Sequence, residues 1–179
     1  MRAVEFAQDP FSDAAHDHRR CVAAAMDQAL DLCERRGVRL TDMRRRVLEL
    51  VWQSHAPIGA YQILEHLAIG RGRVAPPTVY RALDFLSREG LVHRIDRLNA
   101  YVGCSAPQAA HQAYFLICST CGDAAEFHDP GLAAAISGCA QRSGFELAAA
   151  TVELAGLCAR CRAQQPRSRR VASAPPSPA

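Results

Sequence analysis

Two Cys-x-x-Cys pairs, Cys118/Cys121 and Cys158/Cys161, are the residues whose type and spacing most directly suggest chemistry. Each pair follows a segment that is predicted to be a β-strand, and 36 residues separate the two pairs. Such pairs could form disulfides, perform redox chemistry or bind a metal. A thioredoxin-like motif is a single Cys-x-x-Cys that opens a helix, whereas this chain holds two pairs. The arrangement therefore predicts a zinc ribbon with four cysteine ligands, with ordinary buried cysteines or a redox dithiol as the alternatives.

A zinc ion held by four thiolates at about 2.3 Å has a closed tetrahedral shell, so the predicted site is structural and leaves no position for a catalytic water. We see no Ser/His/Asp or paired-carboxylate arrangement and expect no enzyme activity. The chain has no run of about 18 apolar residues, and we expect a cytosolic protein. Thiols stay reduced there, which favours metal ligation over disulfides. We interpret the remaining cysteines on predicted helices as packing residues: Cys21, Cys33 and Cys139.

A second set of possible ligands combines residues that are distant in the sequence. His93 lies in a predicted strand, Cys104 just beyond the next strand, His111 beyond a small polar segment, and Glu126 five residues after Cys121. Two nitrogens, one sulfur and one carboxylate oxygen could form a second zinc tetrahedron between the two halves of the chain. On residue types alone, the alternative is a surface histidine and a solvated glutamate.

The first half of the chain is predicted to form helices followed by a β-hairpin. Apolar residues recur at helical spacing, and the predicted helices cover 14–36, 40–54, 58–69 and 76–90. Strands are predicted at 91–95 and 100–104, around a turn. Thr41 is predicted to cap the second helix. This order of elements predicts a winged helix-turn-helix, which places a helix in the DNA major groove.

The last predicted helix of this half has an apolar and a polar face. Its polar stripe holds Thr78, Arg81, Asp84 and Arg88. Residues 37–97 contain ten arginines and six acidic residues, whereas residues 104–161 contain two arginines and five acidic residues. This asymmetry indicates that the first half faces a polyanion, with scattered solvated arginines as the alternative.

The second half is predicted to be a smaller α/β unit. Strands are predicted at 113–118 and 122–127, a helix at 130–144, a long strand at 145–154 and a turn at 156–161. We therefore expect an α+β protein with five segments: a flexible extension (1–13), a winged-helix DNA-binding domain (14–103), a hinge (104–112), a metal-stabilised domain (113–162) and a disordered tail (163–179).

The stretches "PPTVYRALDFL" and "GLVHRIDRLNAYVGC", followed by the paired Cys-x-x-Cys motifs, resemble the ferric uptake regulator superfamily and in particular its zinc uptake branch. The resemblance runs from about Cys33 to Cys161. It implies a dimeric, metal-dependent repressor with an N-terminal winged helix-turn-helix domain, a hinge and a small α/β dimerisation domain. It also implies a palindromic, A/T-rich double-stranded operator as partner, with no membrane and no small-molecule substrate.

The resemblance also implies roles for individual residues. The structural zinc of the family falls on the four ribbon cysteines, and the sensing zinc falls on His93, Cys104, His111 and Glu126, so two zinc ions per chain are expected. DNA contacts fall on Arg81, with Tyr61, Tyr80 and Thr78 in support. The expected function is a zinc-responsive repressor of zinc uptake and homeostasis genes.

Two alternatives stay open on the sequence. The first is an iron- or peroxide-responsive regulator of the same superfamily, although residues 112–115 hold no histidine where iron sensors usually carry a histidine run. A thiolate at Cys104 also suits zinc better than iron. The second alternative, from a different class, is a zinc-storage or thiol protein that does not bind DNA.

Overall fold

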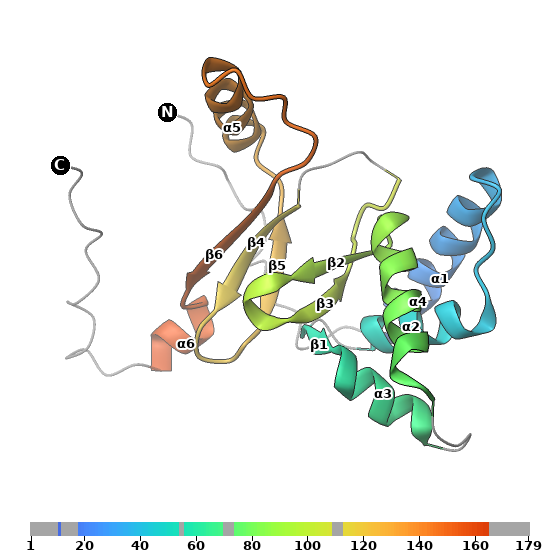
Figure 1. Ribbon diagram of the computed structural model, residues 1–179. Coiled ribbons are helices and arrows are strands. Elements are labelled where there is room, and N and C mark those ends of the chain that lie inside the picture. Colours follow the sequence, from blue (N-terminus) through green and yellow to red (C-terminus); the bar gives the residue numbers. More distant parts are fainter. Residues whose placement is uncertain (1–10, 12–17, 54–55, 70–73, 109–112, 165–179) are drawn as a thin grey trace.

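The computed structural model describes residue 11 and residues 18–53, 56–69, 74–108 and 113–164 (Figure 1). The order of elements is α1 (His18–Arg35), α2 (Asp42–Trp52), β1 (Ile58–Gly59), α3 (Ala60–Ala68), α4 (Pro76–Arg88), β2 (Val92–Ile95), the 3-10 turn η1 (Asp96–Leu98), β3 (Ala100–Gly103), β4 (Ala113–Cys118), β5 (Ala124–Phe127), α5 (Pro130–Arg142), β6 (Thr151–Gly156) and α6 (Ala159–Gln164). The α+β class is confirmed. Within the described ranges, no helix is long and apolar enough to cross a membrane.

The first four helices pack around one apolar core. On α2, Val47 and Val51 are almost completely buried, and on α4 the same holds for Leu83. Buried residues that recur every three or four positions lie on one face of a helix, which explains why these segments fold as helices against each other. The opposite face of α4 is exposed at Arg81 and Asp84, as the sequence pattern predicts.

Two expectations for this half were wrong in detail. The helix predicted over 58–69 begins only at its third residue, because Ile58 and Gly59 pair with the start of β3 as a short strand. Thr41 occupies the N-cap position of α2, but its side chain makes no capping hydrogen bond. Its carbonyl oxygen instead accepts the N–H of Arg45 at 2.9 Å.

β2 and β3 form an antiparallel hairpin, the wing, with β1 at its edge in the order β1-β3-β2. Side chains alternate between the two faces of a strand, so the wing has two faces. One face packs on the helical core through Val92 and Tyr101. The other face packs on the second sheet. There the ring of His93 contacts the ring of Phe115, and Ile95 belongs to the same apolar cluster as Phe115. The wing therefore lies between the helices and the second sheet (Figure 1).

The second sheet has the order β5-β4-β6, with β4 antiparallel to β5 and parallel to β6. Its register places Glu126 and Glu153 on either side of Phe115, in one row across the three strands. Directly paired residues project to the same face of a sheet. Because Phe115 clusters with Ile95 of the wing, the whole row faces the wing.

Further expectations for the second half were also wrong. The strand predicted over 145–154 is shorter at its start, because Thr151 pairs with Ala113, the first residue of β4. The turn predicted at 156–161 gives way to α6, which begins at Ala159. Of the predicted tail at 163–179, the first two residues belong to α6 and the rest lies outside the described residues.

The predictions for the three additional cysteines have different outcomes. Cys33 is buried in the helical core, as expected. Cys139 is exposed, which contradicts its interpretation as a packing residue, because α5 buries none of its residues within the described chain. The side chain of Cys21 lies outside the described part of the structure.

Candidate metal centres and candidate DNA-contacting helix

Four cysteines converge at one end of the second sheet. Cys118 ends β4, Cys121 lies in the following turn, Cys158 follows β6, and Cys161 lies in α6. The four sulfur atoms lie within 4.8 Å of one another, and those of Cys121 and Cys158 are 4.0 Å apart. The pairs meet because β4 and β6 run parallel and end side by side, with Cys118 opposite Gly156. The structure thus brings all four predicted ribbon ligands together.

Hydrogen-bond donors around this cluster favour a thiolate at Cys118, whereas burial raises the pKa of Cys121 and of Cys161. The N–H of Cys158 donates to the sulfur of Cys118 at 3.5 Å, and the N–H of Cys161 donates to the sulfur of Cys158 at 3.4 Å. Burial alone would raise the pKa of Cys118, but backbone N–H groups that donate to its sulfur lower that pKa to about 6. Arg160 contributes a positive charge beside Cys121. Four sulfur donors with no other ligand type match a structural zinc site.

His93, Cys104 and Glu126 form a second cluster, between the wing and the second sheet. One ligand atom of each residue lies within 4.8 Å of the other two, and Nε2 of His93 is 3.2 Å from Oε1 of Glu126. Cys104 is buried, and the other two side chains are only 16% and 9% exposed. His111, the fourth predicted ligand, lies outside the described residues.

Two neighbours that sequence reasoning missed hold this cluster in place. Ser105 donates to Oε2 of Glu126 from its hydroxyl at 3.0 Å and from its backbone N–H at 3.3 Å. The ring of Phe115 packs edge-on against His93, with centroids 5.5 Å apart. Position next to Cys104 was the only sequence signal for Ser105, and Phe115 gave no signal beyond its place in an apolar strand.

The ionisation of the cluster depends on burial and on these contacts. Burial would raise the pKa of Glu126, but the hydrogen bond and charge of His93, together with the bonds from Ser105, lower it to about 2. The carboxylate is therefore ionised at neutral pH. Burial raises the pKa of Cys104 to about 12, so its thiol is protonated until a cation replaces the proton.

The donor set of the second cluster also fits zinc. Nitrogen, sulfur and carboxylate oxygen are the three ligand types that zinc accepts in proteins. Bond lengths of about 2.0–2.3 Å in a tetrahedron place ligand atoms roughly 3.3–3.8 Å apart. The observed separations, all within 4.8 Å, need only a small contraction to reach that geometry.

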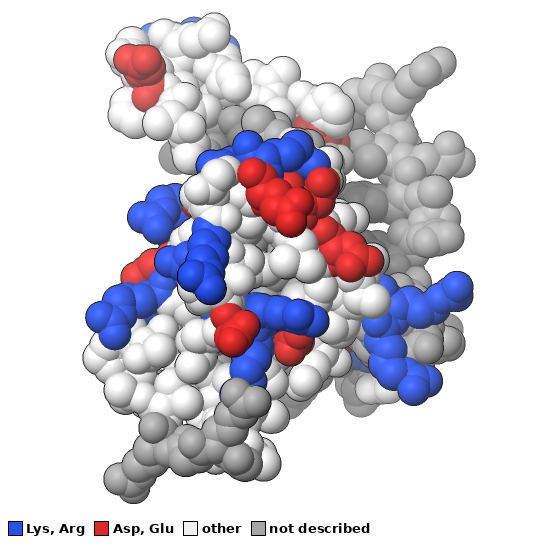
Figure 2. All heavy atoms as spheres, turned by 90° about the vertical axis from the view of Figure 1, so that its right-hand side faces the viewer, with Lys and Arg blue, Asp and Glu red and all other residues white. Residues whose placement is uncertain are grey.

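The predicted DNA contacts lie on the helical unit. On α4, Arg81 and Tyr80 are exposed and Thr78 is partly buried, while Tyr61 on the neighbouring α3 is 70% exposed. Figure 2 shows the helical side of the molecule, where arginine and acidic side chains are interspersed. The exposed aromatic and guanidinium groups of α3 and α4 are chemically suited to contact base edges and phosphates.

Residues 35–155 match the profile of the Ferric uptake regulator family. The chain is 39% identical over 135 residues to the zinc uptake regulation protein of Escherichia coli (strain K12). The aligned region covers 75% of this chain and 79% of that protein. The chain is 30% identical over 139 residues to the peroxide operon regulator of Bacillus subtilis (strain 168). This aligned region covers 78% of this chain and 94% of that protein.

Solved structures give the same result. The fold matches a zinc uptake regulator complexed with zinc and DNA, with a TM-score of 0.75 and 36% identity, over 83% of this chain and 97% of that chain. It also matches holo XcZur, with a TM-score of 0.72 and 40% identity, over 78% of this chain and 98% of that chain. Neither half of the chain alone could supply such coverage, so the similarity includes both sheets.

Proposed function

The chain belongs to the ferric uptake regulator family, and we propose that it is a zinc-responsive transcriptional repressor. When loaded with zinc, it binds operator DNA as a homodimer and controls genes of zinc uptake and homeostasis. The observation that carries the proposal is the convergence of nitrogen, sulfur and carboxylate donors between the wing and the second sheet. The protein acts where the DNA lies, in the cytoplasm, and has no catalytic role.

Two zinc ions per chain have different tasks in this proposal. The first, held by the four cysteines at the end of the second sheet, stabilises the fold of the domain at 113–162. The second, held by His93, Cys104 and Glu126 with His111 as the fourth ligand, is regulatory. Its ligands lie before the hinge (His93), within it (Cys104 and His111) and after it (Glu126), so its affinity depends on how the two domains are oriented.

Zinc can act by selecting one domain orientation. A chain with a hinge samples several orientations, and a ligand shifts their populations only by binding one of them more tightly. If zinc raises operator affinity about 100-fold, the coupling free energy is about 2.7 kcal/mol, and DNA must tighten zinc binding by the same factor. The match to a zinc- and DNA-bound relative over both sheets supports the orientation seen here as the DNA-binding one.

The DNA-binding surface is assigned to α4 and its neighbour α3. In this proposal Arg81 contacts a base edge, and Tyr80, Thr78 and Tyr61 contact the same groove or its phosphates. The exposure of Arg81, Tyr80 and Tyr61 supports these roles. A homodimer presents this helix twice, so the operator is expected to be palindromic. An A/T-rich operator is part of the proposal through the family resemblance.

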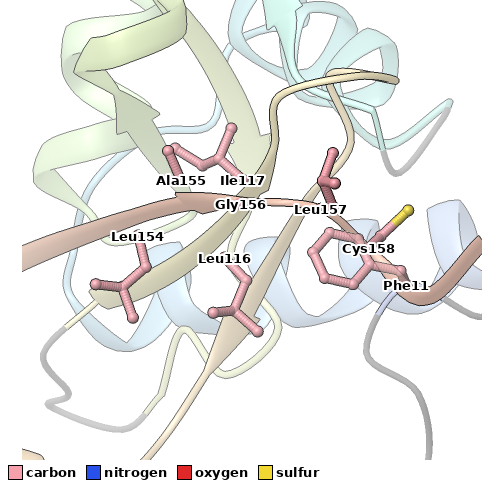
Figure 3. Close-up of a pocket in the computed structure, with 8 residues that line it drawn as sticks. All are labelled: Phe11, Leu116, Ile117, Leu154, Ala155, Gly156, Leu157 and Cys158. Atoms are coloured by element: carbon pink, nitrogen blue, oxygen red, sulfur yellow. The ribbon is translucent and has the colours of Figure 1, made fainter. Parts of the chain in front are cut away.

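The dimer surface is assigned to β6 and α5. β6 is an edge strand, and α5 buries none of its residues within the described chain. Figure 3 shows Leu116 and Leu154 on one side of the sheet, beside a pocket of about 140 Å³ that Phe11 and Leu157 also line. With Phe145 63% exposed as well, a second copy would cover an apolar surface that is unusual for a monomer.

The proposal is tested by removing single regulatory ligands, with Cys104→Ser and His93→Ala. Both variants should remain folded and dimeric and keep one tightly bound zinc per chain, because neither residue belongs to the ribbon. Both should lose the zinc-stimulated binding of operator DNA in a gel shift. His128→Ala is the matched control, since that histidine is exposed and lies outside both clusters.

The same assay separates the alternatives. Zinc, iron and manganese are titrated side by side, and a response to iron in preference to zinc would assign the protein to the iron-sensing branch. Full zinc-stimulated binding of operator DNA by Cys104→Ser would remove the regulatory site from the proposal. A parent protein that holds zinc but fails to bind DNA under any of the metals would favour the storage or thiol class.

A further inference from the structure

One acidic side chain of the second sheet contacts the wing at a distance from the metal cluster. The carboxylate of Glu153, in β6, accepts the backbone N–H of Asp96 at 2.7 Å through one oxygen and that of Arg97 at 3.0 Å through the other. Both donors belong to η1, the turn that connects the two strands of the wing. The side chain therefore bridges two successive N–H groups of another part of the fold.

This contact satisfies groups that the turn itself cannot satisfy. The first N–H groups of a helical turn have no acceptor within it. A carboxylate that accepts two of them forms charge-assisted hydrogen bonds, which are stronger than neutral ones. The contact is also directional, because the two oxygen atoms fix both the position and the angle of η1 relative to β6.

The register of the second sheet gives the contact its significance. Glu126, Phe115 and Glu153 form one row across β5, β4 and β6, and the whole row faces the wing. At one end, Glu126 meets His93; in the middle, the ring of Phe115 also meets His93. At the other end, Glu153 holds η1, only three residues after His93 in the chain.

We infer that Glu153 is a positioning residue for the regulatory zinc site. Its two hydrogen bonds to η1, called the latch below, attach the wing to the second sheet at the opposite end of the row from Glu126. An attachment at the metal cluster alone would let the wing pivot about that point. A second attachment, at the far edge of the sheet, restricts the pivot and keeps His93 and Cys104 facing Glu126. The inference rests on the proposed zinc-dependent function.

The latch should set how much zinc is needed rather than how tightly the zinc-saturated protein binds DNA. A ligand that binds one conformation has its apparent affinity reduced by the fraction of protein in that conformation. Without the latch, fewer zinc-free molecules have the ligands assembled, so half-maximal response needs more zinc. At saturating zinc the metal itself holds the orientation, and operator affinity should remain within about twofold of the parent value.

The experiment compares Glu153→Ala and Glu153→Gln with the parent, and uses Glu146→Ala as the matched control. Glu146 is an exposed glutamate in the segment before β6. Operator binding is followed while free zinc is raised in a metal buffer. The zinc midpoint should rise about tenfold for Glu153→Ala, which corresponds to about 1.4 kcal/mol. It should rise about threefold for Glu153→Gln, because the amide oxygen can replace only one acceptor, and less than twofold for Glu146→Ala.

Amide hydrogen exchange gives a readout that does not depend on metal or DNA. In the zinc-free parent, the N–H groups of Asp96 and Arg97 should exchange slowly, and Glu153→Ala should accelerate both while Glu146→Ala leaves them unchanged. Unchanged exchange, or an unchanged zinc midpoint in a parent that responds to zinc, overturns the latch. Loss of the ribbon zinc or of the dimer in both Glu153 variants overturns it too, because the residue would then serve the folding of the sheet. A parent that shows no zinc response refutes the proposed function, while exchange still decides whether the latch exists.

Discussion

Gly103 tests how closely the wing is fitted to the helices. It lies at the end of β3, directly before Cys104, and on the face of the wing that packs on the helical core. A Cβ atom built on Gly103 would lie 2.2 Å from Cε2, 2.4 Å from Nε1 and 2.6 Å from Cζ2 of Trp52, which ends α2. Gly103→Ala therefore forces the indole and the wing apart.

The size of the effect follows from these distances. Non-bonded carbon atoms prefer separations of about 3.5–4.0 Å, so the ring or the strand must move by roughly 1.3 Å. Overpacking of this kind costs about 1–3 kcal/mol. For a chain of this length, 1 kcal/mol changes the melting temperature by about 2–4 °C, and we expect a decrease of roughly 2–12 °C. Because Cys104 follows directly, the zinc midpoint of operator binding should also rise.

Thermal unfolding and the zinc titration are measured on Gly103→Ala, on Trp52→Leu and on the double variant. Removing the indole relieves the clash, so the double variant should be more stable than the sum of the single effects predicts. Gly59→Ala is the control, since Gly59 lies in the same sheet and its Cβ would meet only the end of the Gln62 side chain, at 3.4 Å. The free energy of unfolding of Gly59→Ala should lie within about 0.5 kcal/mol of the parent value or be slightly higher.

The reasoning is refuted if Gly103→Ala melts with the parent, or if the effects of Gly103→Ala and Trp52→Leu simply add. Either result would mean that Trp52 does not press on the wing. A loss of stability with an unchanged zinc midpoint would keep the packing argument and reject its link to Cys104.

Three further predictions concern the metal sites and α4, the helix proposed to contact DNA. Cys118→Ser should lose the ribbon zinc, the dimer and much of the thermal stability together, because a structural zinc contributes on the order of 10 kcal/mol; a zinc-free variant that stays dimeric and as stable as the parent would contradict the assignment. Arg81→Ala should weaken operator binding by about 1–3 kcal/mol with little effect on random DNA and none on zinc content, whereas equal losses on both would make it a phosphate contact. With its pKa raised to about 12, the Cys104 thiol must release a proton when zinc binds, so affinity for the regulatory zinc should rise with pH by about tenfold per unit between pH 7 and 9. Calorimetry in buffers of different ionisation enthalpy should show one proton fewer released by Cys104→Ser.

The elements that could be predicted are those whose signal is local. α4 could be predicted because its apolar residues recur at helical spacing on one face and its polar residues on the other. The wing could be predicted because two segments with a strand pattern flank a turn. The four cysteines of the ribbon form pairs at a fixed spacing, so their grouping could be expected without any knowledge of the sheet. The signals for α4 and for the wing each lie within about fifteen residues of sequence, and each Cys-x-x-Cys pair spans four residues.

The residues that were missed depend on contacts between distant segments. Glu153 is an ordinary polar residue until the register of β4 with β6 sets it beside the wing. Ser105 is one until the register of β4 with β5 sets Glu126 beside it. The predicted start of β6 was wrong because a strand begins only where its partner strand is available for pairing. That partner, β4, lies more than thirty residues earlier in the chain. Cys139 was misplaced because an apolar helical stripe indicates burial but does not say which surface covers it.

The wing also determines what a regulatory metal can change. The N–H of Leu91 donates to the carbonyl of Leu86 in α4 at 2.9 Å, and the N–H of Cys104 donates to the carbonyl of Leu91 at 3.0 Å. Two backbone hydrogen bonds therefore connect a proposed zinc ligand to α4, the helix proposed to contact DNA, and one face of the wing is buried in the same core as that helix. A wing fixed so firmly to α4 moves with it as one body. Zinc bound between the wing and the second sheet would then orient the whole helical unit relative to the second domain, which carries the proposed dimer surface. The internal structure of α4 would remain unchanged.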